Sequence, residues 1–111
     1  MDISEQRRGE VVVLSPVGRI NNETSPAFQS KLFACVEPAG ATVLVDFSGV
    51  EYISSAGLRA LMVASKQSKT QHGRLAVAGL TPVVKEIFAI SRFSYVVQVF
   101  DTPAQAIAAW R

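Results

Sequence analysis

The chain has 111 residues, of which 49% are hydrophobic and 18% are charged, and its formal net charge is +2 at pH 7. This length fits one globular domain, and the hydrophobic content excludes a disordered tail or linker. The net charge is small, and the Lys and Arg residues are spread along the chain, which argues against nucleic-acid binding. We expect a single domain over residues 1–111.

Cys35 is the only cysteine, so the sequence holds neither an intrachain disulfide nor a cysteine metal cluster. Its apolar neighbours Phe28, Leu32 and Val36 predict a buried thiol. The first residues are polar and do not resemble a secretion signal. No apolar run approaches the roughly 20 residues of a membrane span. These features predict a cytoplasmic protein without direct membrane insertion.

The predicted elements begin with strands. Val11–Leu14 is a continuous apolar run typical of a strand, and residues 3–8 form a weaker candidate edge strand before it. Pro16 and Gly18 are expected to end this region. Residues 19–24 are then read as a loop that leads into the first helix.

The first helix is predicted to have Ser25 as its N-cap and Pro26 as its first helical residue. Pro38 and Gly40 are expected to end it. Residues 42–47 form the second strong strand. A short polar turn is expected between this strand and the next helix.

A long helix is predicted from Ser55 to about Gln71, with Gly73 as its C-cap. Its first half is apolar nearly all round, so we expect it to be buried or covered by a partner. Its second half, residues 65–72, is polar and is expected to be solvated.

The last third continues the alternation of strands and helices. A strand is predicted at residues 75–78, a helix after the cap-and-proline pair Thr81-Pro82, and a strand at residues 96–100. A terminal helix follows Thr102-Pro103, with three residues facing inward: Ala106, Ile107 and Trp110. This order predicts an α/β domain with a largely parallel sheet.

Catalytic constellations are weak in this sequence. A nucleophilic serine needs a base within hydrogen-bond reach, but the only histidine, His72, would stand about 25 Å from Ser55 along one helix. No metal-ligand spacing and no glycine-rich phosphate loop occurs. We expect a protein that is not an enzyme and that uses no cofactor and no metal.

Asp46 has two interpretations, because it ends a strand shortly before a serine-rich segment. Its carboxylate could orient that segment or hold a metal for phosphoryl transfer. It could equally cap a turn by accepting hydrogen bonds from nearby N–H groups.

Ser54 and Ser55 stand at the predicted start of the long helix. A helix N-terminus presents unpaired N–H groups and a positive dipole end, so a phosphate is stabilised there. One of the two serines could instead be only the N-cap. Both interpretations can hold together, because a hydroxyl at this position can remain accessible.

The segment DFSGVEYISSAGLRAL, with VVVLSPVGRIN before it and GRLAVAGLTPVVKEIF after it, resembles the STAS domain of bacterial anti-sigma factor antagonists. The resemblance covers about residues 11–110. It implies a mixed, mostly parallel sheet of four to five strands packed with about four α-helices. It also implies signal transduction and transcription regulation by partner switching. In that process the unphosphorylated antagonist binds a serine-kinase anti-sigma factor and frees its client.

The resemblance further implies that the kinase phosphorylates a serine at the start of the long helix and that a PP2C-type phosphatase reverses the reaction. Many family members carry the acceptor serine directly before Gly, where this chain has Ala56. Members with the Ser-Ser-Ala-Gly-Leu-Arg form resemble antagonists that use the serine before Ala. Ser55 is therefore the expected acceptor, with Ser54 as second choice.

The expected partner-binding surface joins the loop after the first strand to the start of the long helix. Its residues are Asn21, Asn22, Thr24, Ser54, Ser55, Ala56, Gly57, Leu58 and Arg59. Family members often have Asp where this chain has Asn21, and the lost carboxylate could weaken kinase or nucleotide contacts. An alternative is a STAS scaffold subunit of a membrane transport complex of the lipid-trafficking ABC type, which is not phosphorylated.

Overall fold

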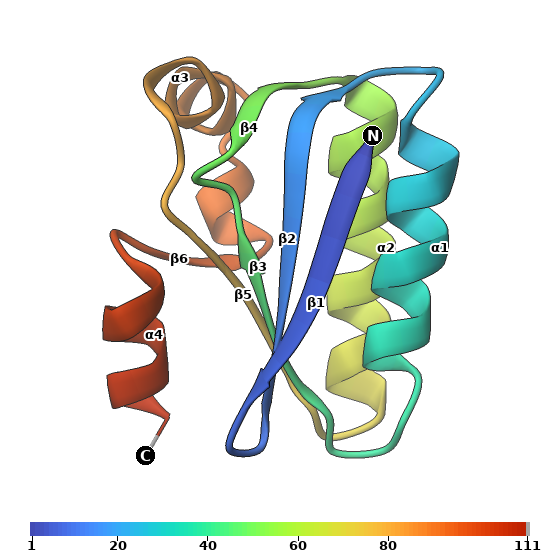
Figure 1. Ribbon diagram of the computed structural model, residues 1–111, viewed down its shortest axis with the longest axis vertical. Helices are drawn as coiled ribbons and strands as arrows, with labels where there is room; N and C mark the ends of the chain where they lie inside the picture. The colour runs from blue at the N-terminus through green and yellow to red at the C-terminus, as the bar shows by residue number, and fades with distance from the viewer. Residues whose placement is uncertain (111) are drawn as a thin grey trace.

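The computed structural model describes residues 1–110, which form a sheet of six strands with four α-helices packed around it (Figure 1). The strands are β1 (Asp2–Arg8), β2 (Val11–Ile20), β3 (Thr42–Asp46), β4 (Val50–Ile53), β5 (Arg74–Ala78) and β6 (Gln98–Phe100). The helices are α1 (Ser25–Val36), α2 (Ser55–Thr70), α3 (Pro82–Ile90) and α4 (Pro103–Ala109), and a 3₁₀-helix, η1 (Phe93–Tyr95), precedes β6. The α/β class is confirmed, with one strand more than the four to five expected.

The sheet is mixed and mostly parallel, as predicted. Its order is β1-β2-β3-β5-β6; β1 pairs with β2 antiparallel, and every other pairing is parallel. The long strand β2 pairs with β3 along its first part and with β4 along its last part. β4 thus continues the position of β3 beside β2, after a turn that includes Gly49.

β2 does not end at Pro16 and Gly18, so that expectation is wrong. Pro16 lies between the stretch of β2 that pairs with β3, which ends at Leu14, and the stretch that pairs with β4, which begins at Gly18. On that side of the strand the missing N–H of proline costs no ladder hydrogen bond. Gly18 has a φ of 112° beside a bulge, a conformation that glycine adopts readily, and the strand continues to Ile20.

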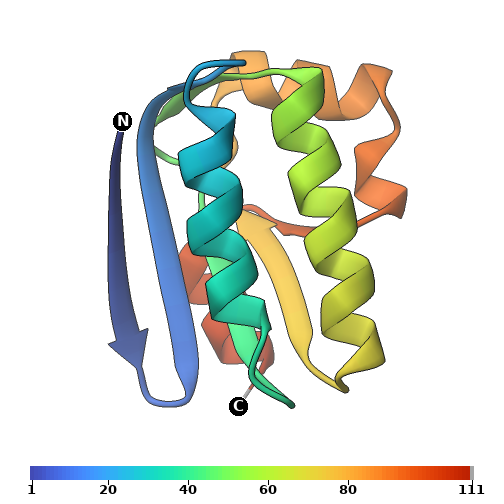
Figure 2. The same ribbon diagram turned by 90° about the vertical axis from the view of Figure 1, so that its right-hand side faces the viewer.

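Helices cover both faces of the sheet. α1 and α2 lie side by side on one face, α4 lies on the other, and α3 crosses one end of the molecule (Figures 1 and 2). The larger core lies under α1 and α2 and includes a chain of aromatic contacts, with Phe47 between Phe28 and Phe88. The smaller core lies under α4 around Leu44, and the inward side of α4 is as predicted: Ala106, Ile107 and Trp110.

The helix ends differ in detail from the expectations. The N-cap position of α1 is Thr24 rather than Ser25, with Pro26 in the first turn. The C-cap of α2 is Gln71, and the left-handed residue after it is His72, with a φ of 60°, instead of Gly73. Gly73 is needed for another reason, because a Cβ there would lie 2.5 Å from the carbonyl oxygen of Ala41.

The second half of α2 is only partly solvated. Ser65 and Ser68 are buried within it, while Lys66 and Lys69 are exposed. The last strand is also shorter than predicted. η1 occupies residues 93–95, and β6 begins only at Gln98, opposite Ala76 of β5.

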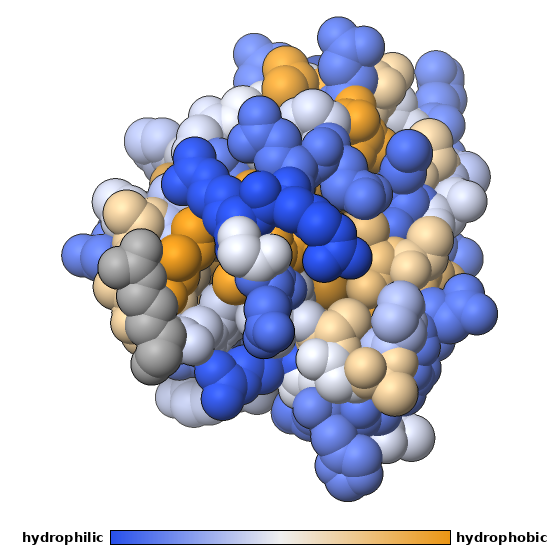
Figure 3. All heavy atoms as spheres, turned by 60° about the horizontal axis from the view of Figure 1, so that its bottom comes forward, coloured by the Kyte–Doolittle hydropathy of each residue, from blue (hydrophilic) through white to orange (hydrophobic). Residues whose placement is uncertain are grey.

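No helix among the described residues is long and apolar enough to cross a membrane. The end of the molecule that carries the β1–β2 turn comes forward in Figure 3, and apolar residues appear there as separate small areas among hydrophilic ones. This face carries no broad apolar patch.

Candidate functional site

Two adjacent serines at the start of α2 have different environments. Ser54 is the N-cap residue, in an extended conformation, and its Oγ accepts a hydrogen bond from the N–H of Gly57 at 3.3 Å. Ser54 is 8% exposed. Ser55 is the first residue of the helix and is exposed. The cap and the accessible hydroxyl are therefore two separate residues.

Gly57 allows the start of α2 to lie close against the sheet. It is buried, and a Cβ there would lie 2.7 Å from Cγ2 of Ile20 and 2.7 Å from Cγ1 of Ile53. These isoleucines are the last residues of β2 and β4. The absence of a side chain at Gly57 therefore sets how closely the start of α2, with its two serines, lies to the sheet.

The loop between β2 and α1 is ordered by its own polar side chains. The Oδ1 of Asn21 accepts hydrogen bonds from the N–H of Glu23 at 2.9 Å and of Thr24 at 3.1 Å. The hydroxyl of Thr24 donates to the carbonyl of Arg19 at 2.7 Å and accepts from the N–H of Asn21 at 2.8 Å. The side-chain oxygen of Asn21 thus makes the turn contacts that an aspartate carboxylate could also make.

This loop and the start of α2 form one end of the molecule. Ile20 and Ile53 are paired at the ends of two parallel strands, and the N–H of Ser54 donates to the carbonyl of Ile20 at 2.8 Å. The β2–α1 loop and the start of α2 therefore both leave the sheet at the carboxyl ends of their strands. This end lies at the top of Figure 1, where α3 also lies. The structure brings together the two segments that the sequence predicted to share a surface.

The predicted partner-binding residues differ in accessibility. Three of them are exposed at this end: Asn22, Ser55 and Arg59. Four are half-buried: Asn21, Thr24, Ala56 and Leu58. Ser54 and Gly57 are buried.

The charges near Ser55 favour an anion. The first turn of α2 contains no acidic residue, so the positive end of the helix dipole is not neutralised by its own side chains. Arg59 is exposed and follows Ser55 by four residues, so both lie on one helix face.

Asp46 is a turn-capping residue. Its Oδ1 accepts hydrogen bonds from the N–H of Ser48 at 3.0 Å and from the hydroxyl of Ser48 at 2.6 Å. β4 separates it from the serines, so of its two interpretations the turn cap holds.

Residues 1–110 contain no group of three or more potential metal ligands. His72 lies beyond the far end of α2 from Ser55.

Cys35 is half-buried rather than buried, so that prediction is wrong in part. Its Sγ lies 3.5 Å from Oε1 of Glu5, which reaches across from β1. Desolvation and the charge and hydrogen bond of this carboxylate raise the pKa of the thiol to about 11. A thiol of this kind is protonated at neutral pH and makes a poor nucleophile.

The comparisons with known proteins agree with one another. The sequence profile of the STAS domain matches residues 2–106. A Bordetella bronchiseptica protein named as a candidate anti-sigma factor antagonist, BtrV, is 33% identical over 94 residues, which are 85% of this chain and 81% of that protein.

Two solved structures share the fold. A candidate anti-sigma factor antagonist from Thermotoga maritima matches with a TM-score of 0.88 at 21% identity, over 96% of this chain and 92% of that one. The unphosphorylated anti-sigma factor antagonist SpoIIAA of Bacillus matches with a TM-score of 0.81 at 18% identity, over 99% of this chain and 96% of that one. With its profile match and its six-stranded mixed sheet, the chain belongs to the STAS domain family.

Proposed function

We propose that this chain is an anti-sigma factor antagonist that acts by partner switching, with Ser55 as its phosphorylation site. The unphosphorylated form binds a serine-kinase anti-sigma factor through the β2–α1 loop and the start of α2, and that kinase releases its client. The observation that carries the proposal is the division of roles at the start of α2. Ser54 caps the helix, and Ser55 remains exposed.

Accessibility favours Ser55 over Ser54 as the acceptor. A kinase must place the hydroxyl in line with the γ-phosphate of ATP, which requires an exposed side chain. Ser54 is 8% exposed and its Oγ is engaged by Gly57, so its phosphorylation would require the first turn of α2 to open. Ser55 meets the requirement without any rearrangement of the helix.

The fold tolerates a phosphate at Ser55. The modification adds about −1.5 to −2 charges at pH 7. The helix dipole stabilises an anion in the first turn by about 0.3–1 kcal/mol. Arg59, four residues further on, adds a favourable pair with the anion on its N-terminal side.

The interface with the kinase does not tolerate a phosphate at Ser55. Ala56 and Leu58, both half-buried, give the start of α2 small or apolar side chains against which a partner can pack closely. A phosphate in that interface is desolvated, and a buried ion without a partner of its own costs several kcal/mol. Since each 1.4 kcal/mol is a factor of ten in affinity, the modification releases the kinase.

The chain supplies no catalysis in this scheme. Phosphoryl transfer comes from the kinase, and removal of the phosphate comes from a PP2C-type phosphatase. The chain itself provides the acceptor hydroxyl and a surface whose charge changes.

Intact-mass spectrometry after incubation with ATP and the serine-kinase anti-sigma factor of the same organism tests the proposal. A single phosphate addition is expected in the parent protein and in Ser54→Ala, and none is expected in Ser55→Ala. A kinase that phosphorylates a control substrate but leaves the parent unmodified would contradict the proposal and favour the scaffold alternative in a transport complex.

A further inference from the structure

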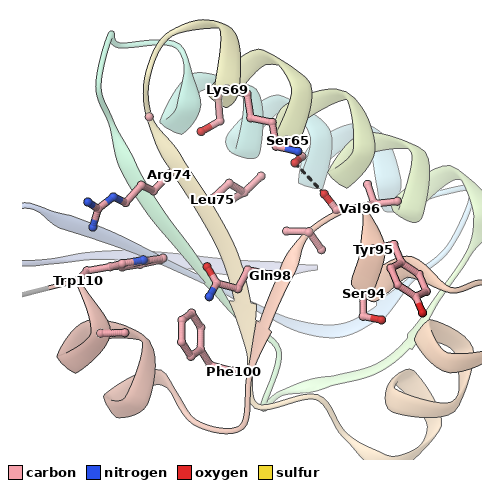
Figure 4. Close-up of a pocket in the computed structure, with 14 residues that line it drawn as sticks. Ser65, Lys69, Arg74, Leu75, Ser94, Tyr95, Val96, Gln98, Phe100 and Trp110 are labelled. Carbon is pink, nitrogen blue, oxygen red and sulfur yellow. Dashed lines mark hydrogen bonds between the residues drawn. The ribbon is translucent and has the colours of Figure 1, made fainter.

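A notch opens in the sheet edge where β6 falls short of β5. β6 pairs with β5 from Ala76 onward, so Arg74 and Leu75 have β3 on one side and no strand on the other. The notch has a volume of about 710 Å³. Its walls are the second half of α2, the segment from η1 to β6 and the end of α4, and Figure 4 shows side chains from all three around it.

The segment that leads into β6, residues 94–97, forms a third wall of this notch and does not run beside the first residues of β5. The hydroxyl of Ser65 donates to the carbonyl of Val96 at 3.1 Å, and the N–H of Val97 donates back to the carbonyl of Phe93 at 3.2 Å. These bonds draw the segment before β6 towards α2. The first bond is drawn in Figure 4.

The backbone N–H of Leu75 faces the notch. The N–H of Arg74 donates to the carbonyl of Ala41, on the β3 side of β5. Because successive residues of a strand direct their N–H groups to opposite edges, the N–H of Leu75 points to the β6 side. It lies one residue before the first pair of the β5–β6 ladder, Ala76 with Gln98.

The two cations of the notch stand on opposite faces of the sheet. Lys69 belongs to α2, which covers the face where Leu75 packs. Arg74 alternates with Leu75, and so it shares the other face with Ala76, which packs in the core under α4. Among the described residues that line the notch, none is Asp or Glu.

We propose that this notch binds a short extended acidic segment of a partner protein, laid in line with β6. One of its carbonyls accepts the N–H of Leu75. Neighbouring side chains of a strand point to opposite faces, so two adjacent acidic residues meet Lys69 on one face and Arg74 on the other. An extended strand places one carboxylate on each face, and therefore the arrangement of charges suits a strand.

Other features of the notch suit a polar backbone. The Oγ of Ser68 is buried in the α2 wall without a hydrogen-bond partner, and the amide of Gln98 lies at the centre of the opening in Figure 4. Trp110 and Phe100 pack edge to face at 5.9 Å and close the α4 side with apolar surface.

The notch lies far from the start of α2. Lys69 follows Ser55 by nearly the whole length of the helix, about 20 Å at the rise of an α-helix. Binding here is therefore independent of the phosphorylation state of Ser55. Failure of the peptide to bind at the notch therefore does not bear on the proposed role of Ser55, and failure of phosphorylation at Ser55 does not bear on the notch.

An NMR titration of the ¹⁵N-labelled chain tests the proposal, with fluorescence of Trp110, the only tryptophan, as a second readout. The probe is the blocked hexapeptide Thr-Val-Asp-Glu-Val-Thr. Its isomer Thr-Asp-Val-Glu-Val-Thr, which places both acids on one face, is the control. We expect a saturable shift of the Leu75 amide and about two- to fivefold tighter binding of the first peptide.

Variants that remove one positive charge each test whether Lys69 and Arg74 bind the peptide. Lys69→Gln and Arg74→Gln each weaken binding by about two- to fivefold, whereas Lys66→Gln, an exposed lysine on the same helix that does not line the notch, has no effect. Ser55→Asp binds like the parent. Equal affinity of the two isomers, no saturable shift of Leu75, or displacement of the peptide by inorganic phosphate at equal concentration would overturn the proposal, the last in favour of a small-anion site.

Discussion

The backbone N–H of Ser54 donates a hydrogen bond to the carbonyl of Ile20 at 2.8 Å. This bond extends the β2–β4 pairing and joins the segment that carries the phosphorylation candidate to the strand that leads into the Asn21 loop. The two halves of the proposed interface are therefore held at a fixed distance by the backbone, and side chains at either segment act on one surface.

Ser54 and Ser55 are predicted to differ in their effect on stability. Ser54→Ala removes the acceptor for the N–H of Gly57 and should lower the free energy of unfolding by about 1 kcal/mol. Ser55→Ala changes an exposed first-turn residue and should stay within about 0.5 kcal/mol of the parent. Urea denaturation followed by circular dichroism measures both. Equal losses in the two variants would refute the division of roles.

Gly57→Ala is predicted to destabilise the domain, although alanine is the better helix former. The added Cβ would lie 2.7 Å from side-chain carbons of Ile20 and Ile53. Overpacking of this kind costs about 1–3 kcal/mol, which exceeds the roughly 1 kcal/mol that alanine gains in a helix. A thermal melt checks the sign. A higher melting temperature would show that α2 does not need the close approach.

Asn21 is predicted to act through its side-chain oxygen. Asn21→Asp keeps the acceptor for Glu23 and Thr24 and should retain the stability of the parent, whereas Asn21→Ala should lose about 1 kcal/mol. Denaturant titration of the two variants gives the comparison. If Asn21→Ala is as stable as Asn21→Asp, the loop is ordered by Thr24 and the backbone alone.

The raised pKa of Cys35 predicts that the free energy of unfolding decreases at alkaline pH. Its pKa rises from 9.0 to about 11 on folding, so between these values the folded state holds a proton that the unfolded state has lost. The contribution is complete below pH 9 and is lost as the pH rises towards 11. Unfolding free energies of the parent and Cys35→Ala across this range measure the difference. Parallel curves would show that the thiol is not perturbed.

The fold was predictable where apolar runs are long. The strands around Val12, Leu44 and Val77 and the long helix α2 follow directly from hydrophobic periodicity. β4 was missed because it has only four residues, Glu51 among them, between the turn at Ser48-Gly49 and the N-cap Ser54 of α2. Its place beside the end of β2 depends on tertiary pairing, which no local pattern contains. The passage of β2 through Pro16 has the same origin.

The candidate site was predictable in part. The proline and hydroxyl signals located the start of each helix to within one residue, and the family resemblance pointed to the Ser54-Ser55 pair. Which hydroxyl caps the helix depends on the rotation of the first turn relative to the strand before it. That rotation follows from the contact of Gly57 with Ile20, which are distant in sequence. The notch beside Leu75 depends on the length of β6, which the sequence overestimated.

The most direct test of the central claim is the dissociation constant of the serine-kinase anti-sigma factor for the chain, unphosphorylated and phosphorylated at Ser55, measured by isothermal titration. We predict at least about 100-fold weaker binding after phosphorylation, the equivalent of several kcal/mol in the interface, with an unchanged melting temperature of the free chain. Equal affinity of the two forms would contradict the account.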